Sequence, residues 1–298
     1  MGLKVEWKDH RGTVWNLTDG TEGVLLDLGQ KGWGWSELEH VFTRGDAQWA
    51  SSRVKRGIHE LKVTVGWSPE TGFYTGEDYY KLAHEWWSQA NSPFHLGELI
   101  VTRPDGTVRS RKLRLWESPE TEYTYDPGIG QEPEPELWAL TGDGGYWQGV
   151  EQVYTYQQSA MTGGSGTPFY GKQGAGWPLY ISSAATAENA VIDNRGQGAM
   201  WLVWTLVGPL SNPRFGTSAG VLTYAGDIPA GEVVEVRTDP AERIVVEQSS
   251  GSNRYGFIRG DFAPAPSGDR IPLVISAEGM SANSSVMVTA REQYARAF

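Results

Sequence analysis

Residues 199–207 constrain the fold of this 298-residue chain more than any other stretch. Its side chains are apolar on both sides of the backbone, in two alternating sets: Met200, Leu202, Trp204 and Leu206, and Trp201, Val203 and Val207. Successive residues of a β-strand face opposite ways, so this pattern predicts a strand that is covered on both faces. We therefore expect this part of the chain to fold as packed sheets.

The neighbouring residues predict a tight turn before this strand and a stop after it. Asp193-Asn194-Arg195-Gly196 joins Asx side chains, which bond to nearby backbone, with a glycine that tolerates a positive φ. Gly208-Pro209 and Asn212-Pro213 follow the strand, and proline cannot donate a hydrogen bond to a strand ladder. Residues 191–215 are thus expected to form a turn, a buried strand and a rigid exit.

Composition points to an all-β protein. The chain has 38 Gly, 14 Trp and 13 Tyr, which is typical of many turns and of strands rich in aromatic residues. It has no cysteine, which excludes disulfides, thiolate nucleophiles and cysteine metal sites. Its length allows two domains.

Charge divides the chain into two parts. Residues 1–116 contain 15 basic and 15 acidic side chains, whereas residues 117–298 contain 10 and 21 and so carry the whole net charge of −11. An acidic surface with so few cations argues against specific binding to nucleic acid.

The sequence shows no targeting or membrane segment. The first residues lack the apolar run of a secretory signal, and Glu6 stands where a myristoylation motif has Ser or Thr. No stretch reaches the roughly 18 apolar residues that a membrane helix needs. We expect a chain that does not insert into a membrane.

The first part of the chain predicts an antiparallel meander. Short strands are expected at residues 4–7, 13–17 and 24–28, with turns between them. Residues 61–67 alternate between apolar and polar side chains, the period of a half-buried strand.

One helix is predicted. It begins near Thr75, whose spacing to Asp78 fits a capping box, and continues to about Ala90. Its apolar stripe consists of Tyr79, Leu82, Ala83, Trp86 and Ala90, with Trp87 beside it. The stripe either closes the open side of a β domain or, through Trp86 and Trp87, meets a neighbouring subunit.

A basic hairpin and an acidic segment follow the helix. Strands at residues 99–102 and 109–116 flank the turn Pro104-Asp105-Gly106. The hairpin is either a solvated face or a surface that binds acidic groups of another subunit, and its basic residues are Arg103, Arg109, Arg111, Lys112 and Arg114. Residues 117–136 carry seven carboxylates, four prolines and no basic residue, the composition of a linker.

The last part predicts an antiparallel β-sandwich. Residues 161–176 have the glycine-rich composition of a long mobile loop. Short strands with turns between them are expected at residues 179–182, 221–224, 233–238, 243–247, 255–259, 272–277 and 286–290. We therefore predict two all-β domains joined by an acidic linker at residues 117–136. The N-terminal domain, residues 1–116, would be like a β-barrel or β-sandwich with one helix, and the C-terminal domain, residues 137–298, would be a β-sandwich.

No catalytic constellation is recognisable. The sequence lacks a nucleophile elbow, a P-loop and a dinucleotide fingerprint, and its five histidines lack metal-ligand spacing. We expect no cofactor, no metal site and no enzymatic activity. Hydrolysis of a glycoside by paired carboxylates remains an alternative, because an acidic chain offers many such pairs.

A group of aromatic residues allows carbohydrate binding. They lie around the entry to the second domain and either belong to its core or stack on sugar rings: Trp147, Tyr154, Tyr156, Tyr170, Trp177 and Tyr180. A host-glycan-binding β-sandwich is therefore an alternative function.

The second half resembles the C-terminal domain of distal tail proteins of long, non-contractile phage tails. The turn with Asn194 and Gly196, the apolar strand, Gly208-Pro209 and Asn212-Pro213 carry this likeness. So do the turn Ile228-Pro229-Ala230-Gly231-Glu232, with its Pro229 and Gly231, and a closing segment that ends near Arg291. Residues 1–116 match the layout of that family's N-terminal domain.

The resemblance implies a structural minor tail protein of the virion, with no catalytic residues and no cofactor. N-terminal domains would form a homohexameric ring at the distal end of the tail. The ring would connect the tail tube protein to the tail-tip or baseplate hub and other minor tail proteins, and galectin-like C-terminal sandwiches would project outward. Assembly would take place in the host cytoplasm. The basic hairpin and the acidic linker would pair between subunits.

Overall fold

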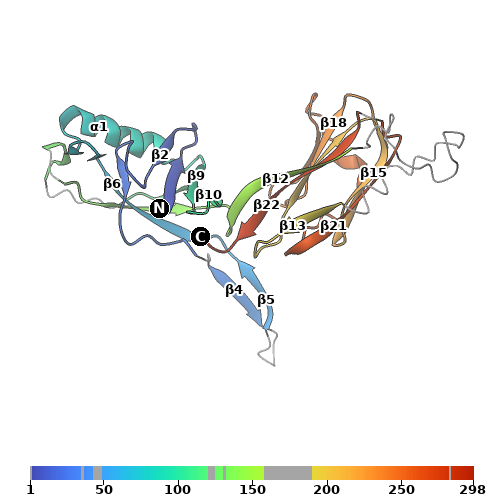
Figure 1. Ribbon diagram of the computed structural model, residues 1–298, viewed down its shortest axis with the longest axis horizontal. Helices are drawn as coiled ribbons and strands as arrows, with labels where there is room; N and C mark the ends of the chain where they lie inside the picture. Colours follow the sequence, from blue (N-terminus) through green and yellow to red (C-terminus); the bar gives the residue numbers. More distant parts are fainter. Residues whose placement is uncertain are drawn as a thin grey trace, which may run out of the picture. The chain divides into compact units, whose positions relative to one another are not determined.

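The computed structural model describes residues 2–34, 37–42, 49–119, 125–129, 132–157, 190–281 and 283–298. The chain divides into two compact units, the first comprising residues 1–150 with 294–298, and the second residues 151–293. Strand β12 (Trp147–Gln157) carries the chain into the second unit, and β22 (Ser285–Tyr294) brings it back. Both units consist mainly of antiparallel strands, which confirms the all-β prediction (Figure 1).

The first unit is built from short strands before its helix and longer strands after it. Those before the helix are β1 (Lys4–Lys8), β2 (Val14–Asn16), β3 (Val24–Leu26), β4 (Leu38–Phe42), β5 (Trp49–Val54), β6 (Ile58–Val65), β7 (Trp67–Ser68) and β8 (Gly72–Phe73). Those after it are β9 (Gly97–Thr102), β10 (Val108–Glu117) and β11 (Glu136–Thr141), with a 3-10 turn at Pro127–Ile129. The three short strands and the basic hairpin β9–β10 are confirmed. The predicted meander is wrong after β2, because β3 pairs with β6 and not with β2.

Strand β10 joins the two sheets of the first unit. Its first part pairs with β9 from Val108 to Leu113, in the order β2-β1-β9-β10. Its last part pairs with β11, in the order β10-β11-β6-β3, with a register shift between Leu115 and Glu117. A β-bulge bends a strand and increases its twist, which lets one strand serve two sheets.

The core of the first unit is rich in tryptophan. The large side chains that are fully buried there include Trp7, Trp86, Trp138, Trp147, Leu61, Leu99 and Leu113. They come from both sheets and from the helix. The alternating burial of β6, in which every second residue is buried, is the period predicted for residues 61–67.

Helix α1 (Gly76–Glu85) continues as a π-helical turn at Trp86–Ala90. The predicted helix is therefore present, and its stripe packs on the core through Trp86 and Ala90. The predicted capping box is wrong, because Thr75 at the N-cap makes no side-chain capping hydrogen bond. The reciprocal bond of a capping box uses Glu or Gln, and the shorter Asp78 stands at that position.

Strands β4 and β5 form a separate two-stranded sheet. The hairpin projects from the first unit beyond its other strands (Figure 1). No strand is predicted for these residues from the sequence. An isolated two-stranded hairpin is marginally stable in water, so packing against another surface is the usual way to stabilise one.

The second unit is a sandwich of two sheets. One has the order β19-β18-β14-β22-β12 and the other the order β13-β21-β15-β16-β20, with β17 paired to β15. Besides β12 and β22, the strands are β13 (Val191–Asn194), β14 (Leu202–Val207), β15 (Leu210–Thr217), β16 (Gly220–Tyr224), β17 (Asp227–Ile228), β18 (Val233–Arg237), β19 (Ile244–Glu247), β20 (Ile258–Gly260) and β21 (Gly268–Glu278), and a 3-10 turn lies at Tyr255–Phe257.

Trp204 on β14 and Phe215 on β15 pack together across the two sheets, with ring centroids 5.3 Å apart. Leu202, Trp204 and Leu206 on β14 are buried, whereas the opposite face of that strand is only half-buried. The prediction of a strand covered on both faces is therefore wrong, because one sheet of a sandwich packs on its partner through a single face.

The predicted exit from this strand is right at Gly208-Pro209, which follows β14 directly and contains a cis peptide bond. It is wrong at Asn212-Pro213, which lies inside β15. The register of β15 with β21 shifts between Ser211 and Arg214, and such a bulge is where a strand accepts a proline.

The boundaries of the compact units differ from the predicted domain boundaries. Strand β11 pairs with β6 and β10, so residues 137–150 belong to the first unit rather than the second. Glu117 ends β10 and Glu136 begins β11, so both ends of the predicted linker lie in strands. Residues 158–189, with the predicted glycine-rich loop and the strand at 179–182, lie outside the described residues. Separate folding of the two domains stays a prediction.

No helix within the described ranges is long and apolar enough to cross a membrane.

Candidate interaction surfaces

The basic hairpin residues do not form one free charged face. Arg111 is only 3% exposed, and its Nη2 donates to the carbonyl of Gly144 at 3.1 Å. Burial lowers the pKa of this guanidinium. Arg114 pairs with Asp143 at 2.5 Å, and Arg103 lies 3.4 Å from Asp105 at the hairpin turn. Lys112 is exposed. Of the five basic residues proposed as inter-subunit contacts, Arg111 is wrong because its side chain is buried inside its own unit.

Arg109 binds the C-terminal segment of the chain. Its Cζ lies 3.9 Å from the ring centroid of Tyr294, and its Nη1 donates to the carbonyl of Arg296 at 2.9 Å. The backbone N–H of Ala297 donates to the carbonyl of Trp33 at 2.8 Å, and Ala297 is fully buried. Residues 294–298 therefore complete the first unit, which the sequence did not indicate.

Of the two helix tryptophans, only Trp87 retains exposed surface. Trp86 is fully buried and packs edge-to-face on Trp15 at 5.3 Å and on Trp138 at 5.9 Å. Trp87 is half-buried and packs on Trp138 at 4.7 Å. Trp86 therefore helps to close the open side of its own β domain. The prediction that Trp86 contacts another subunit is wrong, because its side chain is buried.

A carboxylate is buried beside these tryptophans. Glu136 accepts a hydrogen bond from Nε1 of Trp87 at 3.1 Å and another from Nε1 of Trp138 at 2.9 Å. Burial raises the pKa of Glu136 to about 7, although both hydrogen bonds act in the opposite direction. Glu136 is one of the seven carboxylates of the predicted linker, and the structure places it in a strand instead. Its position directly before the apolar Leu137-Trp138 was the one local signal of a strand.

His59 is another buried titratable group in the first unit. Its ring packs edge-to-face on Trp33 at 5.4 Å and on Trp147 at 6.0 Å. Burial and the nearby charge of Arg111 lower its pKa to about 4. No group of three or more metal-ligating side chains occurs in the part of the chain that the structure describes.

Asn194 and Gly196 organise the start of the second unit. Asn194 is fully buried, and its Nδ2 donates to the carbonyls of Gly198 and Pro266, each at 3.0 Å. Its Oδ1 accepts from the backbone N–H of Gly196 at 3.2 Å, which confirms the predicted Asx turn. Gly196 has no positive φ. A Cβ there would lie 2.3 Å from the carbonyl oxygen of Gln293, so glycine is required by close packing against β22.

The remaining fold markers meet at one end of the sandwich. A Cβ on Gly208 would lie 2.0 Å from the carbonyl oxygen of Pro229. The N–H of Gly208 donates to the carbonyl of Glu232, and the N–H of Glu232 to the carbonyl of Pro229. Gly231 has a φ of 86°, and Asn212, with a φ of 45°, accepts from the N–H of Gly226 through Oδ1. These residues thus build the fold.

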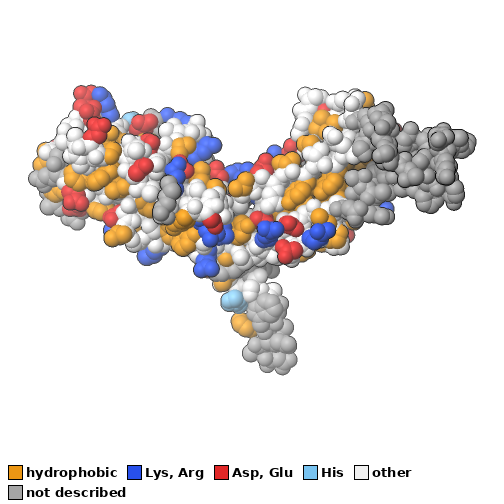
Figure 2. All heavy atoms as spheres, viewed as in Figure 1, with side chains coloured by type: hydrophobic (Ala, Val, Ile, Leu, Met, Phe, Trp, Pro, Cys, Tyr) orange, Lys and Arg blue, Asp and Glu red, His pale blue; other side chains and the backbone are white. Residues whose placement is uncertain are grey.

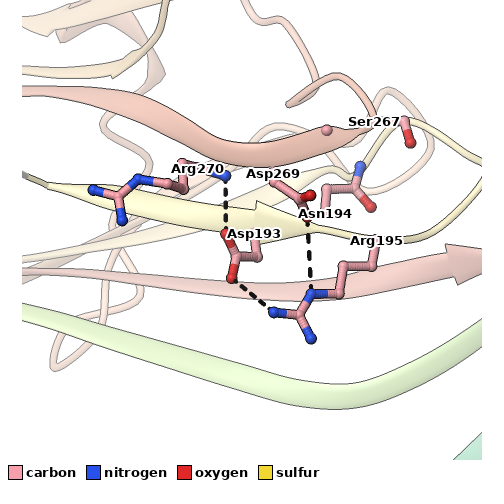
Figure 3. A pocket seen from close by; sticks show the side chains of 7 residues that line it. Asp193, Asn194, Arg195, Ser267, Asp269 and Arg270 are labelled. Atoms are coloured by element: carbon pink, nitrogen blue, oxygen red, sulfur yellow. Dashed lines mark hydrogen bonds and ion pairs between the residues drawn. The ribbon is translucent and has the colours of Figure 1, made fainter.

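A polar hollow of about 690 Å³ lies beside the Asn194 turn (Figure 3). Asp193 accepts from the backbone N–H of Arg270 at 2.9 Å and lies 3.5 Å from Nη2 of Arg195. Asp269 lies 3.9 Å from Nε of Arg195. Both carboxylates are thus engaged by Arg195, and Asp193 also by backbone, in a solvated turn. These contacts hold β13 to β21.

The aromatic residues suggested for sugar binding divide into three groups. Trp147 is fully buried in the first unit, which excludes it from stacking on a ligand. Tyr154 and Tyr156 pack against the core of the second unit and are partly buried. Tyr170, Trp177 and Tyr180 lie outside the described residues.

Exposed apolar side chains are concentrated in the first unit. Among the described residues, 13 large exposed hydrophobic side chains belong to the first unit and four to the second. Hydrophobic side chains also lie on the projecting β4–β5 hairpin (Figure 2), where Leu38, Val41 and Phe42 are exposed. The three apolar side chains on one hairpin make that hairpin a candidate contact with another subunit.

No family model and no curated protein matches the chain. Solved structures do match. The crystal structure of SPP1 Dit, described as a paradigm of the hub adsorption apparatus in phages that infect Gram-positive bacteria, aligns over 99% of this chain and 100% of its own, at 11% identity and a TM-score of 0.57. The chain has the fold of SPP1 Dit. A chain of the phage P2 baseplate, in its activated conformation with calcium, aligns over 98% of both chains at 13% identity, with a TM-score of 0.52.

The likeness to SPP1 Dit and to the baseplate chain extends over both units, because each alignment spans nearly the whole chain. The resemblance drawn from residues 191–291 is thereby confirmed at the level of the fold. Fold alone does not establish a function, and at these identities the likeness concerns the fold.

Proposed function

We propose that this chain is a structural distal tail protein of a phage. Six copies would form a ring that connects the tail tube to the tail-tip or baseplate hub, and would assemble in the host cytoplasm. The observation that carries the proposal is the alignment with SPP1 Dit along the entire length of both chains, through both units. In this role the protein acts by assembly and is not an enzyme.

The first unit supplies the ring contacts in this proposal. It holds most of the exposed apolar side chains that the structure describes. It also holds the β4–β5 hairpin, which pairs with no further strand among the described residues. Packing the β4–β5 hairpin on a neighbouring copy would cover Val41 and Phe42. Arg103, Lys112 and the half-buried Trp87 remain candidate contacts. Pairing of the two cations with the acidic segment of another copy would weaken at high salt.

Oligomeric mass with negative-stain imaging tests the proposal. We expect a particle of about six times the chain mass of 32.8 kDa, with a central opening. Replacing Val41 and Phe42 together by Ser should shift the protein to smaller species, because the exposed apolar area of the hairpin is lost. The matched control is Ile244→Ser, which alters an exposed apolar residue of the second unit. A monomer at high concentration, with no rings in images, would overturn the proposal.

A further inference from the structure

We propose that the second unit carries a binding site for an acidic polysaccharide, built on the exposed rings of Tyr255 and Phe257 and the arginines beside them. This site goes beyond the adaptor role and does not depend on ring formation. It is also distinct from the aromatic residues that sequence analysis suggested for sugar binding.

Each of the two rings is supported on one side by a second ring. Tyr255 stacks on Phe262 with centroids 5.8 Å apart and planes 4° apart. Phe257 stacks on Tyr224 at 5.2 Å and 8°, and Tyr224 is buried. Tyr255 and Phe257 are nevertheless 44% and 41% exposed. The 3-10 turn Tyr255–Phe257 therefore presents two fixed aromatic rings to solvent, two residues apart.

Arginines accompany both stacks. The Cζ of Arg243 lies 4.4 Å from the ring centroid of Phe262, on the Tyr255 stack. The Cζ of Arg254 lies 5.8 Å from that of Phe257, and its Nη2 lies 3.7 Å from Glu232. Arg259 is exposed, and its Nη1 donates to the carbonyls of Gly256 and Ile258. These guanidinium groups are held at the rings by stacking or by hydrogen bonds to backbone.

Two of these arginines are not paired with a carboxylate. Residues 243–260 contain three arginines and one carboxylate, Glu247, and are flanked by Glu242 and Asp261. Arg254 is paired with Glu232, whereas Arg243 and Arg259 form no ion pair with the described residues. The oxygens of Glu247 accept from the backbone N–H groups of Ser249 and Ser250, so this carboxylate is engaged locally. An anionic ligand would thus find two guanidinium groups, those of Arg243 and Arg259, that are not already neutralised by an ion pair.

The combination of groups favours a sugar polymer over an acidic protein segment. A supported aromatic ring offers one flat apolar face, which suits the apolar face of a sugar ring. Guanidinium groups bind carboxylate or phosphate through paired hydrogen bonds. The exposed apolar area here is confined to the rings of Tyr255 and Phe257, whereas a protein partner usually buries a larger apolar core.

Binding of defined polymers to the full-length chain tests this site. The probes are polygalacturonate, which bears carboxylates, phosphomannan, which bears phosphates, neutral dextran and polyglutamate. We expect titration calorimetry to detect at least one of the two acidic polysaccharides and to show much weaker binding of dextran. Tyr255→Leu and Arg243→Gln should each weaken that binding about tenfold, since loss of one anchor in a small site has this effect.

Phe94→Leu and Arg214→Gln are the matched controls, because they make the same types of change at exposed positions elsewhere. Arg243→Gln keeps the aliphatic part of the side chain over Phe262, and thermal unfolding verifies that each variant is folded. The proposal is overturned if neither acidic polysaccharide binds, or if Tyr255→Leu and Arg243→Gln both bind as the wild type does. It is also overturned if polyglutamate binds as tightly as the polysaccharide and both substitutions weaken its binding equally. Ring formation is measured separately by mass, so failure of this site leaves the adaptor role standing.

Discussion

The guanidinium of Arg109 stacks on the ring of Tyr294, with Cζ 3.9 Å from the ring centroid. Arg109 lies in the basic hairpin and Tyr294 is the last residue of β22, so this contact fastens the end of the chain to the first unit. Desolvated cation–π pairs stabilise a protein by about 1–2 kcal/mol.

We therefore expect Tyr294→Leu to lower the unfolding free energy of the first unit by about 1–2 kcal/mol relative to Tyr294→Phe, which keeps the aromatic face. Deleting residues 295–298 should cost more, because the hydrogen bonds from Arg109 to Arg296 and from Ala297 to Trp33 are also lost. Chemical unfolding followed by tryptophan fluorescence measures both effects. Equal stability of the Leu and Phe variants would contradict the role of the ring.

Glu136 should make the protein less stable as the pH rises. Its pKa of about 7 lies above the ordinary value of 4.5, so its contribution is fully present below pH 4.5 and is lost as the pH rises through 7. The difference amounts to about 3 kcal/mol. Glu136→Gln has no such titration, so its stability relative to the wild type should improve by about that amount between pH 4.5 and pH 8. Urea unfolding at several pH values measures this difference, and a constant difference would refute the assignment.

His59 should make the protein less stable as the pH falls. Its pKa of about 4 lies below the ordinary value of 6.5, so its contribution is present above pH 6.5 and is lost as the pH falls through 4. His59→Phe keeps a ring against Trp33 and Trp147 and removes the titration. We expect the stability of this variant relative to the wild type to rise by about 3 kcal/mol between pH 7.5 and pH 3.5. Exposed His84→Phe serves as the control and should show no comparable trend.

Gly208 should tolerate no side chain. The Cβ of Gly208→Ala would lie 2.0 Å from the carbonyl oxygen of Pro229, which is backbone and cannot move aside cheaply. The expected loss is at least about 3 kcal/mol. Gly231→Ala is the matched control, since nothing lies within 4 Å of its Cβ and only its φ of 86° opposes the change. That control should lose about 1 kcal/mol in thermal or urea unfolding. Similar losses for both would show that the contact with Pro229 is not what selects glycine.

The local pattern of the sequence determined much of the secondary structure. Alternation identified β6 and the buried face of β14, the Pro104-Asp105-Gly106 turn identified the β9–β10 hairpin, and the apolar stripe identified the helix. These features depend on neighbours within a few residues, and their chemistry can be read directly. The absence of cysteine and the all-β composition were equally accessible.

The tertiary structure alone decided which side chains are available for contacts. Arg111 and Trp86 belong to segments that the sequence marked as interaction surfaces, yet both are buried by strands distant in the sequence. Glu136 follows a segment with the composition of a linker, yet it begins strand β11, because β11 pairs with β6 and β10. Glycine is required at position 196 because the backbone of Gln293 lies against it. The exposed ring of Tyr255 is held in place by Phe262, on which Arg243 stacks. Local pattern specifies strands and turns, whereas burial and contact depend on long-range packing, which no single stretch of sequence contains.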